Sequence, residues 1–279
     1  MITIAEALAA AAARIGGATP RLDAEVLLAH ALGVDRGALF LNPDRRFDPQ
    51  AFEILIVRRV AGDPVAYITG TREFWSLDLA VTPDVLIPRP DSETLVEAAL
   101  AARPDARRVL DLGTGSGALL LAVLSELSAA TGLGVDASRA ALAVAAGNAA
   151  RLGFADRAAF GLGDWGQGLA ERFDLILCNP PYVETGADLT PEVRREPAAA
   201  LFAGADGLDD YRRLMPQLPG LLAPEGVAVL EIGASQAAAV GRLAAAAGLV
   251  AMLRHDLAGM ARALVLTAKG QIRSSVSCV

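Results

Sequence analysis

Four consecutive residues, Asn179-Pro180-Pro181-Tyr182, have the composition of a binding rim for a planar amino group. They follow an apolar run of strand length, Phe173 to Cys178. In an open α/β sheet, ligands bind beyond the carboxyl ends of the strands. The prolines fix φ and lack N–H groups, so the rim is rigid and offers two acceptors, the Asn179 side-chain oxygen and the Pro180 carbonyl. The flat Tyr182 ring lies beside them. The alternative is a tight Pro-Pro turn with a purely structural role.

A second stretch with chemical potential is the glycine-rich segment Asp111-Leu112-Gly113-Thr114-Gly115-Ser116-Gly117. It ends a predicted strand and opens a helix, where the backbone approaches a ligand closely and favours negative groups. The spacing satisfies a loose dinucleotide fingerprint with Ala118 at the third glycine position. Asp136, at the end of the next strand, is placed to hold ribose hydroxyls. A nicotinamide cofactor and a structural glycine turn therefore both stay open at this point.

Two acidic positions favour S-adenosylmethionine over a dinucleotide. Asp111 precedes the glycines, where a carboxylate can reach the amino group of the methionine part, whereas a pyrophosphate gains nothing from an acid. Asp164-Trp165 follows the third strand, and there an acid can accept from the adenine amino group while the indole offers a face to the ring. Taken singly, Asp164 fits a helix cap and Trp165 a core aromatic. Successive carboxyl-end loops nevertheless each carry an acidic or amide side chain: Asp111, Asp136, Asp164 and Asn179.

From Arg107 onward, strand-like and helix-like patterns alternate, which predicts an α/β fold with a mostly parallel sheet and helices on both faces. The predicted strands are Val109–Leu112, Gly134–Asp136, Ala158–Leu162, Phe173–Cys178, Val227–Ile232, Leu249–Arg254 and Ala263–Thr267. Helices are expected at about 93–102, 117–129, 138–152, 208–222 and 235–247. The tail after Gly270 is expected to be frayed.

Residues 3–62 have helical periodicity. Thr3-Ile4-Ala5-Glu6 is a capping-box pattern for a first helix that Gly16-Gly17 ends. Further helices are predicted from Arg21 to Leu32, over 35–41, and from an N-cap at Asp48 to Val60. Few polar side chains converge there. A small module that binds a partner is the favoured interpretation, and a structural cap on the second domain is the alternative.

The link from Pro64 to Pro90 differs in sequence pattern from the helical segment before it and the alternating segment after it. Val65–Ile68 and Phe74–Val81 alternate in part around Gly70, which predicts a β-hairpin. The stretch 86–90 is stiff and extended, and Asp91 or Ser92 can cap the following helix. With Phe74, Trp75 and Arg89, this link either lines a site or serves as an inter-domain strut.

Composition narrows the class of protein further. Of 279 residues, 53% are hydrophobic, which supports a sizeable core. The net charge of −7 comes entirely from residues 63–279, so neither part has the basic excess typical of nucleic-acid binding. No secretory signal or membrane span is evident, and Cys178 and Cys278 suggest neither a disulfide framework nor a zinc site. A cytoplasmic protein without a metal site is expected.

Together these motifs resemble the class I S-adenosylmethionine-dependent methyltransferases, in the branch that methylates planar nitrogens of DNA, RNA or glutamine. The flanking segments resemble the release factor glutamine methyltransferases, the PrmC/HemK family, over nearly the whole chain. The matching segments are Gly62–Gly70, Arg72–Trp75, Leu86–Glu93, Glu192–Arg194, Glu196-Pro197, Ala200-Leu201 and Asp206–Leu208.

This resemblance implies a Rossmann-like seven-stranded domain and methylation of N5 of the glutamine in the Gly-Gly-Gln motif of peptide-chain release factors. Expected domains are a partner-binding helical domain at 1–62, a hinge at 63–91 and a methyltransferase domain at 92–279. The chain is expected to be a monomer that contacts neither membrane nor nucleic acid directly. The expected catalytic residues are Asn179, Pro180 and Tyr182, joined at the substrate by Pro181, Phe74 and Arg89. The expected cofactor-binding residues are Asp111, Gly113, Thr114, Gly115, Ser116, Gly117, Asp136, Asp164, Trp165 and Asn179.

Two other functions fit parts of the pattern. A nucleic-acid amino methyltransferase shares the Asn179–Tyr182 tetrapeptide, but is expected to show a basic face or a target-recognition insertion. A non-catalytic nucleotide-binding regulator explains the glycine segment, but gives no reason for the tetrapeptide. A nicotinamide dehydrogenase needs an acid or base poised at a hydride acceptor, and the only histidines, His30 and His255, lie outside these motifs.

Overall fold

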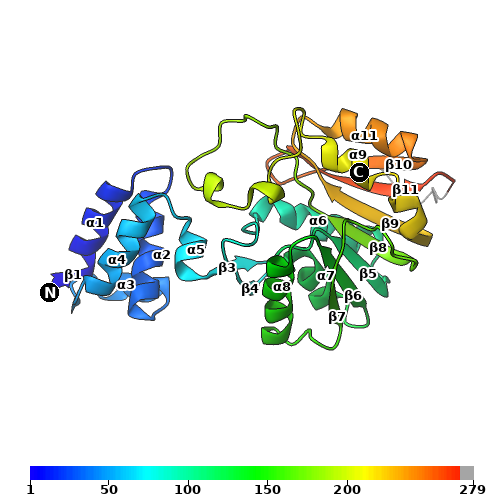
Figure 1. The fold of residues 1–279 in the computed structure, drawn as a ribbon. Coiled ribbons are helices and arrows are strands. Elements are labelled where there is room, and N and C mark those ends of the chain that lie inside the picture. Colours follow the sequence, from blue (N-terminus) through cyan, green and yellow to red (C-terminus); the bar gives the residue numbers. More distant parts are fainter. Residues whose placement is uncertain (271–279) are drawn as a thin grey trace. The chain divides into compact units, whose positions relative to one another are not determined.

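The computed structural model describes residues 1–270, which form two compact units (Figure 1). Unit 1 comprises residues 1–71 and 189–195, and unit 2 comprises residues 72–188 and 196–270. The predicted frayed tail and Cys278 lie outside the described residues. Within the described chain, no helix is long and apolar enough to cross a membrane.

Unit 1 is a helical bundle closed by a short strand pair. Its elements are β1 (Ile2–Thr3), α1 (Ile4–Ile15), α2 (Pro20–Leu32), α3 (Arg36–Leu41), β2 (Arg46–Phe47), α4 (Gln50–Val60), α5 (Val65–Thr69) and the short 3-10 helix η2 (Val193–Arg195). The predicted capping box is confirmed: Thr3 Oγ1 accepts from the Glu6 amide at 3.2 Å, and the Glu6 carboxylate accepts from the Thr3 amide at 2.9 Å. Apolar side chains of α1, α2 and α4 form one buried core.

Two local predictions in this part of the chain are wrong. Val65–Ile68, predicted as a strand, forms the helix α5, which begins after Pro64 and ends at Gly70 in the left-handed conformation. A short apolar run does not distinguish a strand from a buried helical turn. The predicted hairpin exists a few residues later, as β3 (Thr71–Phe74) and β4 (Leu77–Ala80). The N-cap of α4 is Pro49 rather than Asp48, whose carboxylate still accepts from the Gln50 amide at 3.1 Å.

Unit 2 contains the predicted sheet, in the strand order β10-β11-β9-β8-β5-β6-β7. The strands are β5 (Arg108–Leu112), β6 (Thr131–Asp136), β7 (Ala158–Leu162), β8 (Phe173–Cys178), β9 (Leu222–Glu231), β10 (Leu249–His255) and β11 (Ala261–Ala268). The strands from β7 to β9 in this order run parallel, and β11 pairs antiparallel with both β9 and β10. After β5 the chain forms β6 on one side of β5, and later forms β8 on the other side of β5. This reversal of strand order creates a switch point between β5 and β8, where ligands bind in such sheets.

Helices cover both faces of this sheet. One core packs beneath α6 (Glu93–Ala102), α7 (Ala118–Glu126) and α8 (Arg139–Arg151), and a second beneath α9 (Asp209–Leu214), α10 (Leu218–Leu221) and α11 (Ala237–Ala246). Alternate residues of β5 face opposite sides, since Val109 joins the first core and Leu110 the second. The single helix predicted over 208–222 is wrong, because it is interrupted around Pro216 and forms two helices, α9 and α10. Two 3-10 turns, η1 (Pro90–Ser92) and η3 (Ala198–Ala200), complete the unit.

Candidate active site

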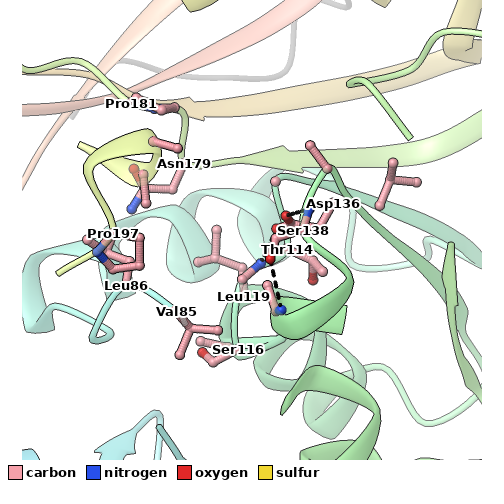
Figure 2. A pocket seen from close by; sticks show the side chains of 18 of the residues that line it. Val85, Leu86, Thr114, Ser116, Leu119, Asp136, Ser138, Asn179, Pro181 and Pro197 are labelled. Carbon is pink, nitrogen blue, oxygen red and sulfur yellow. Dashed lines mark hydrogen bonds between the residues drawn. The ribbon is translucent and has the colours of Figure 1, made fainter. Parts of the chain in front are cut away.

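One pocket of about 590 Å³ lies in unit 2 at the carboxyl ends of the parallel strands. Figure 2 shows Asn179 and Pro181 on one side of it, and Asp136 and Ser138 on the other. Most of the predicted site residues line this pocket: Phe74, Arg89, Gly113, Thr114, Gly115, Ser116, Asp136, Asp164, Trp165, Asn179 and Pro181. Segments far apart in the sequence thus converge on a single cavity.

Other predicted residues lie next to this pocket without lining it: Asp111, Gly117, Pro180 and Tyr182. Gly117 is the N-cap of α7, with φ of 84°. Trp75 also lies outside the lining, and its indole N–H donates to Glu126 at 2.8 Å. Of the aromatic pair in the link, only Phe74 therefore reaches the cavity.

The glycine segment turns tightly from β5 into α7 beneath the Trp165 ring. Gly113 has φ of 73°, and a Cβ there would stand 3.2 Å from Trp165. A side chain at Gly113 would therefore be strained and would displace the ring. Gly115, at φ of 54°, directs its N–H to the Asp136 carboxylate at 2.9 Å. The turn thus leaves room for a ligand that the Trp165 ring can cover.

Asp136 is fixed by the backbone at both oxygens. Its second oxygen accepts from the Ser138 amide at 2.8 Å, and Ser138 in turn caps α8 by accepting from the Ala141 amide at 3.2 Å. Each carboxylate oxygen can accept a further hydrogen bond. A rigid carboxylate that lines a pocket in this way suits a pair of vicinal hydroxyls.

Asp111 is buried directly behind the glycine turn, with only 1% of its surface exposed. Its Oδ2 accepts from the Thr114 hydroxyl at 2.6 Å, whereas Oδ1 has no hydrogen-bond partner among residues 1–270. Burial raises the pKa of this carboxyl to about 7, and the nearby Asp136 adds to the increase while the Thr114 hydrogen bond opposes it. A buried acceptor without a partner costs free energy, so Asp111 is suited to a cationic group of a ligand.

At the far side of the glycine segment, Asp164 is held by Arg213 from α9, with 2.5 Å between Nη2 and Oδ1. The same guanidinium pairs with Asp210 at 3.1 Å. Burial raises the pKa of Asp210, although the Arg213 charge opposes this. Trp165 adopts φ of 53°, unusual for a bulky residue. The ring lies next to Gly113, and Asp164 and Trp165 line the same pocket.

The Asn179 loop is held from behind. The Asn179 side-chain nitrogen donates to the Ser92 hydroxyl oxygen at 3.4 Å. Tyr182 is anchored at two points, because its hydroxyl donates to Glu231 at 3.2 Å and its carbonyl accepts from Gln236 at 3.0 Å. Burial raises the pKa of the Tyr182 hydroxyl, and the Glu231 charge adds to this effect. The loop is therefore a fixed rim, as its prolines predict.

A second rim is built by the segments on either side of the pocket mouth. Leu86, Pro88 and Arg89 come from the link, and Pro197, Ala199 and Ala200 from the segment containing η3. The buried Glu196 carboxylate joins these segments, since it accepts from the Ile87 amide at 3.0 Å and forms an ion pair with Arg89. Arg89 thus lines the cavity with its charge already compensated.

Several residues of the site were not predicted from sequence: Ser138, Glu196, Arg213 and Glu231. Asp91 or Ser92 was predicted to cap the next helix. Ser92 is the N-cap residue of α6, but its side chain makes no cap bond and donates to Glu231 at 2.5 Å. The sequence does single out Glu231, because this acid directly follows the apolar run Val227–Leu230 and so ends a buried strand. Its partners could not be identified, since Ser92 is 139 residues away.

Family models and known proteins resemble this chain over most of its length. Residues 6–70 match the family model described as the PrmC N-terminal domain, and residues 104–246 match a methyltransferase domain. A release factor glutamine methyltransferase from Rhodospirillum rubrum is 48% identical over 254 residues, which cover 88% of this chain and 78% of the relative. One from Cereibacter sphaeroides is 48% identical, over 88% of this chain and 91% of its own. The solved structure of ribosomal protein L11 methylase from Lactobacillus delbrueckii subsp. bulgaricus shares the fold, with a TM-score of 0.51 and 20% identity over 65% of this chain and 80% of that one.

Proposed function

The chain belongs to the release factor glutamine methyltransferase family, and we propose that it methylates N5 of the glutamine in the Gly-Gly-Gln motif of peptide-chain release factors. One observation carries this proposal. The glycine segment and the Asn179 loop line the same pocket, so a methyl donor held by the first lies beside an amide held by the second. The place of action proposed for this reaction is the cytoplasm, where release factors work.

Side chains that line the pocket, together with Asp111 directly behind the glycine turn, fit S-adenosylmethionine as the methyl donor. Asp111 Oδ1, buried and without a partner among the described residues, suits the positive amino group of the methionine part. Asp136 suits the ribose hydroxyls, and Asp164 with Trp165 suits the amino group and face of adenine. When bound, this cofactor supplies an electrophilic methyl group on a positively charged sulfur.

The residues of the Asn179 loop are proposed to orient the substrate amide. An amide nitrogen is a poor nucleophile because its lone pair is delocalised into the carbonyl. The Asn179 side-chain oxygen and the Pro180 carbonyl accept the two N–H bonds and aim the nitrogen at the methyl group. Tyr182 packs beside the amide plane. Such positioning contributes on the order of 7–11 kcal/mol in well-oriented systems. A strong base is not needed before transfer, because the amide proton can leave afterwards.

Phe74, Pro181 and Arg89 are proposed to complete the substrate side of the pocket. Phe74 is a buried aromatic side chain at the cavity wall, and Arg89 is neutralised by Glu196. Neither residue therefore presents a free charge to a neutral amide. This suits a glutamine side chain better than an anionic substrate such as a nucleic-acid phosphate.

The test of this function is Asn179→Ala. We expect the Kd for S-adenosylmethionine to change by less than about threefold, and kcat on purified release factor to fall by about 100- to 1,000-fold, the size seen when one preorganised polar group is removed. Calorimetry and a methyl-transfer assay with labelled cofactor measure the two quantities. An unchanged kcat would contradict the proposed role of Asn179.

A further inference from the structure

An acidic side chain lies behind the Asn179 loop and takes no direct part in the function proposed above. Glu231 ends β9, is 1% exposed and does not line the pocket. Its Oε2 accepts from the Ser92 hydroxyl at 2.5 Å, and its Oε1 accepts from the Tyr182 hydroxyl at 3.2 Å. Burying a carboxylate costs free energy, because the charged form loses its hydration. Both oxygens of Glu231 bond to residues next to the rim, so the position of this acid needs an explanation.

Ser92 is the link between Glu231 and Asn179. An ionised carboxylate only accepts hydrogen bonds, so the single hydroxyl proton of Ser92 must point to Glu231. The Ser92 oxygen can then only accept from Asn179. The amide of Asn179, a residue that lines the pocket, accordingly directs its nitrogen to Ser92 at 3.4 Å, so its oxygen points away from Ser92.

We propose that Glu231 is a positioning residue that sets the direction of the hydrogen bonds running through Ser92 to Asn179, and so presents the Asn179 oxygen to the N–H of the substrate amide. This relay, Glu231–Ser92–Asn179, rests on the proposed function. It moves no proton to or from the substrate. Its role is to prevent the Asn179 amide from turning over, which would offer an NH₂ group to another NH₂ group.

The surroundings of Glu231 make the relay sensitive to pH. Burial raises the pKa of Glu231, while the hydrogen bond from Ser92 and the charge of Arg262 oppose this. The titratable and charged groups that face it come from the neighbouring segments: Asp91 from η1, Cys178 from β8, Tyr182 from the rim, Tyr211 from α9 and Arg262 from β11. Tyr211 donates to the backbone oxygen of Glu231 at 2.7 Å, and Arg262 pairs with Asp91 at 3.0 Å.

Protonation of Glu231 would remove the constraint on the direction of the hydrogen bonds from Glu231 through Ser92 to Asn179. A neutral carboxyl can donate to Ser92, whose hydroxyl is then free to donate to Asn179 and let the amide turn. Because the pKa of Glu231 lies above that of an ordinary glutamic acid, turnover is lost as the pH falls through this raised pKa, and is full above it. Saturating cofactor separates this effect from titration of Asp111, which acts on cofactor binding.

The experiment compares Glu231→Gln and Ser92→Ala with the wild-type chain, using purified release factor and saturating S-adenosylmethionine across the acid range. A matched control is Glu171→Gln, because Glu171 is 63% exposed and pairs with Arg108 away from the pocket. We expect kcat to fall about 10- to 100-fold in Glu231→Gln, the size of one hydrogen bond to a charged group. The decrease of kcat at low pH should disappear in Glu231→Gln and Ser92→Ala and persist in Glu171→Gln. Each variant should still bind one cofactor per chain.

The double variant provides the second readout. Because both changes break one relay, Glu231→Gln/Ser92→Ala should be within about twofold of the worse single variant. The relay would be overturned if Glu231→Gln kept the wild-type kcat and its decrease at low pH. It would also be overturned if the double variant showed the product of the two single decreases in kcat. If Glu231→Gln does not fold, Ser92→Ala decides in the same way. A wild-type chain that does not methylate release factor would instead overturn the proposed function on which the relay rests.

Discussion

At the scale of single residues, Asp111 has the environment that binding of a cation would relieve most. Its Oδ1 has no partner among residues 1–270, and burial holds its pKa at about 7. A positive group placed against it would stabilise the ionised form. Protonation and cofactor binding at Asp111 therefore oppose each other.

We accordingly expect the affinity for S-adenosylmethionine to fall as the pH drops below about 7, by up to about tenfold per pH unit, because the neutral carboxyl no longer attracts the amino group. Calorimetric titrations between pH 5.5 and 8.5 would measure this. The matched variant Asp111→Asn keeps an oxygen for the Thr114 hydroxyl and should lose that part of the pH dependence. Identical pH profiles for wild type and Asp111→Asn would contradict the assignment.

Position along the predicted strands is enough to group some of the residues that line the pocket. Gly113 and Asn179 directly follow predicted strands and Asp136 ends one, so the switch-point rule places them at the same edge of the sheet. Ser92 and Glu231 depend on each other across 139 residues, and only the folded chain shows that the serine serves the carboxylate rather than the helix end. Position along a strand predicts proximity to the site, whereas partner choice depends on tertiary packing.

At the scale of elements, a buried ion pair organises unit 1. Arg59 of α4, 8% exposed, bonds Asp23 of α2 at 2.7 Å. The same guanidinium also pairs with Glu192, just before η2, and donates to the Asp63 carbonyl at 3.3 Å. One side chain thus joins two helices to the segment 189–195 within this unit.

Arg59→Met should lower the free energy of unfolding by about 3 kcal/mol, because it leaves the Asp23 carboxylate buried without its partner. Urea titration followed by circular dichroism would measure the change. The adjacent Arg58→Met is the matched control: Arg58 is 43% exposed at its ion pair with Asp63, and its loss should cost less than about 1 kcal/mol. Equal losses in the two variants would refute the importance of burial at Arg59.

Elements were predicted well where periodicity was long. The helices α6, α7, α8 and α11 and most strands of the main sheet lie close to their predicted ranges, whereas β6 and β9 begin three and five residues before the predicted starts at Gly134 and Val227. The errors at α5 and at α9–α10 share a cause, since a few residues near proline carry too little pattern to determine a conformation. Tertiary contacts decide these short pieces.

At the scale of the whole molecule, unit 2 carries the pocket described above, and unit 1 carries exposed apolar side chains. The exposed side chains of unit 1 include Phe40 at 54%, Ile54 at 60% and Val57 at 55%. Ile54 and Val57 are three residues apart on α4, and so share one face. We propose that this face of unit 1 contacts the release factor outside its glutamine motif.

The double variant Ile54→Ser/Val57→Ser should therefore lower kcat/KM for whole release factor about tenfold or more, while leaving kcat/KM for a short Gly-Gly-Gln peptide unchanged. Steady-state assays on both substrates measure this. Met252→Ser, at an apolar side chain of unit 2 that is 43% exposed, controls for loss of surface hydrophobicity. An equal decrease on both substrates would contradict a docking role for unit 1.

The proposed reaction at the pocket is methylation of a glutamine of a release factor. The most direct test incubates the purified chain with labelled S-adenosylmethionine and either release factor, the same factor with its Gly-Gly-Gln glutamine replaced by alanine, or nucleic acid. We expect one methyl group per intact factor, located on the glutamine by mass spectrometry, and none on the other two. Label on the alanine variant or on nucleic acid, with none on that glutamine, would contradict it.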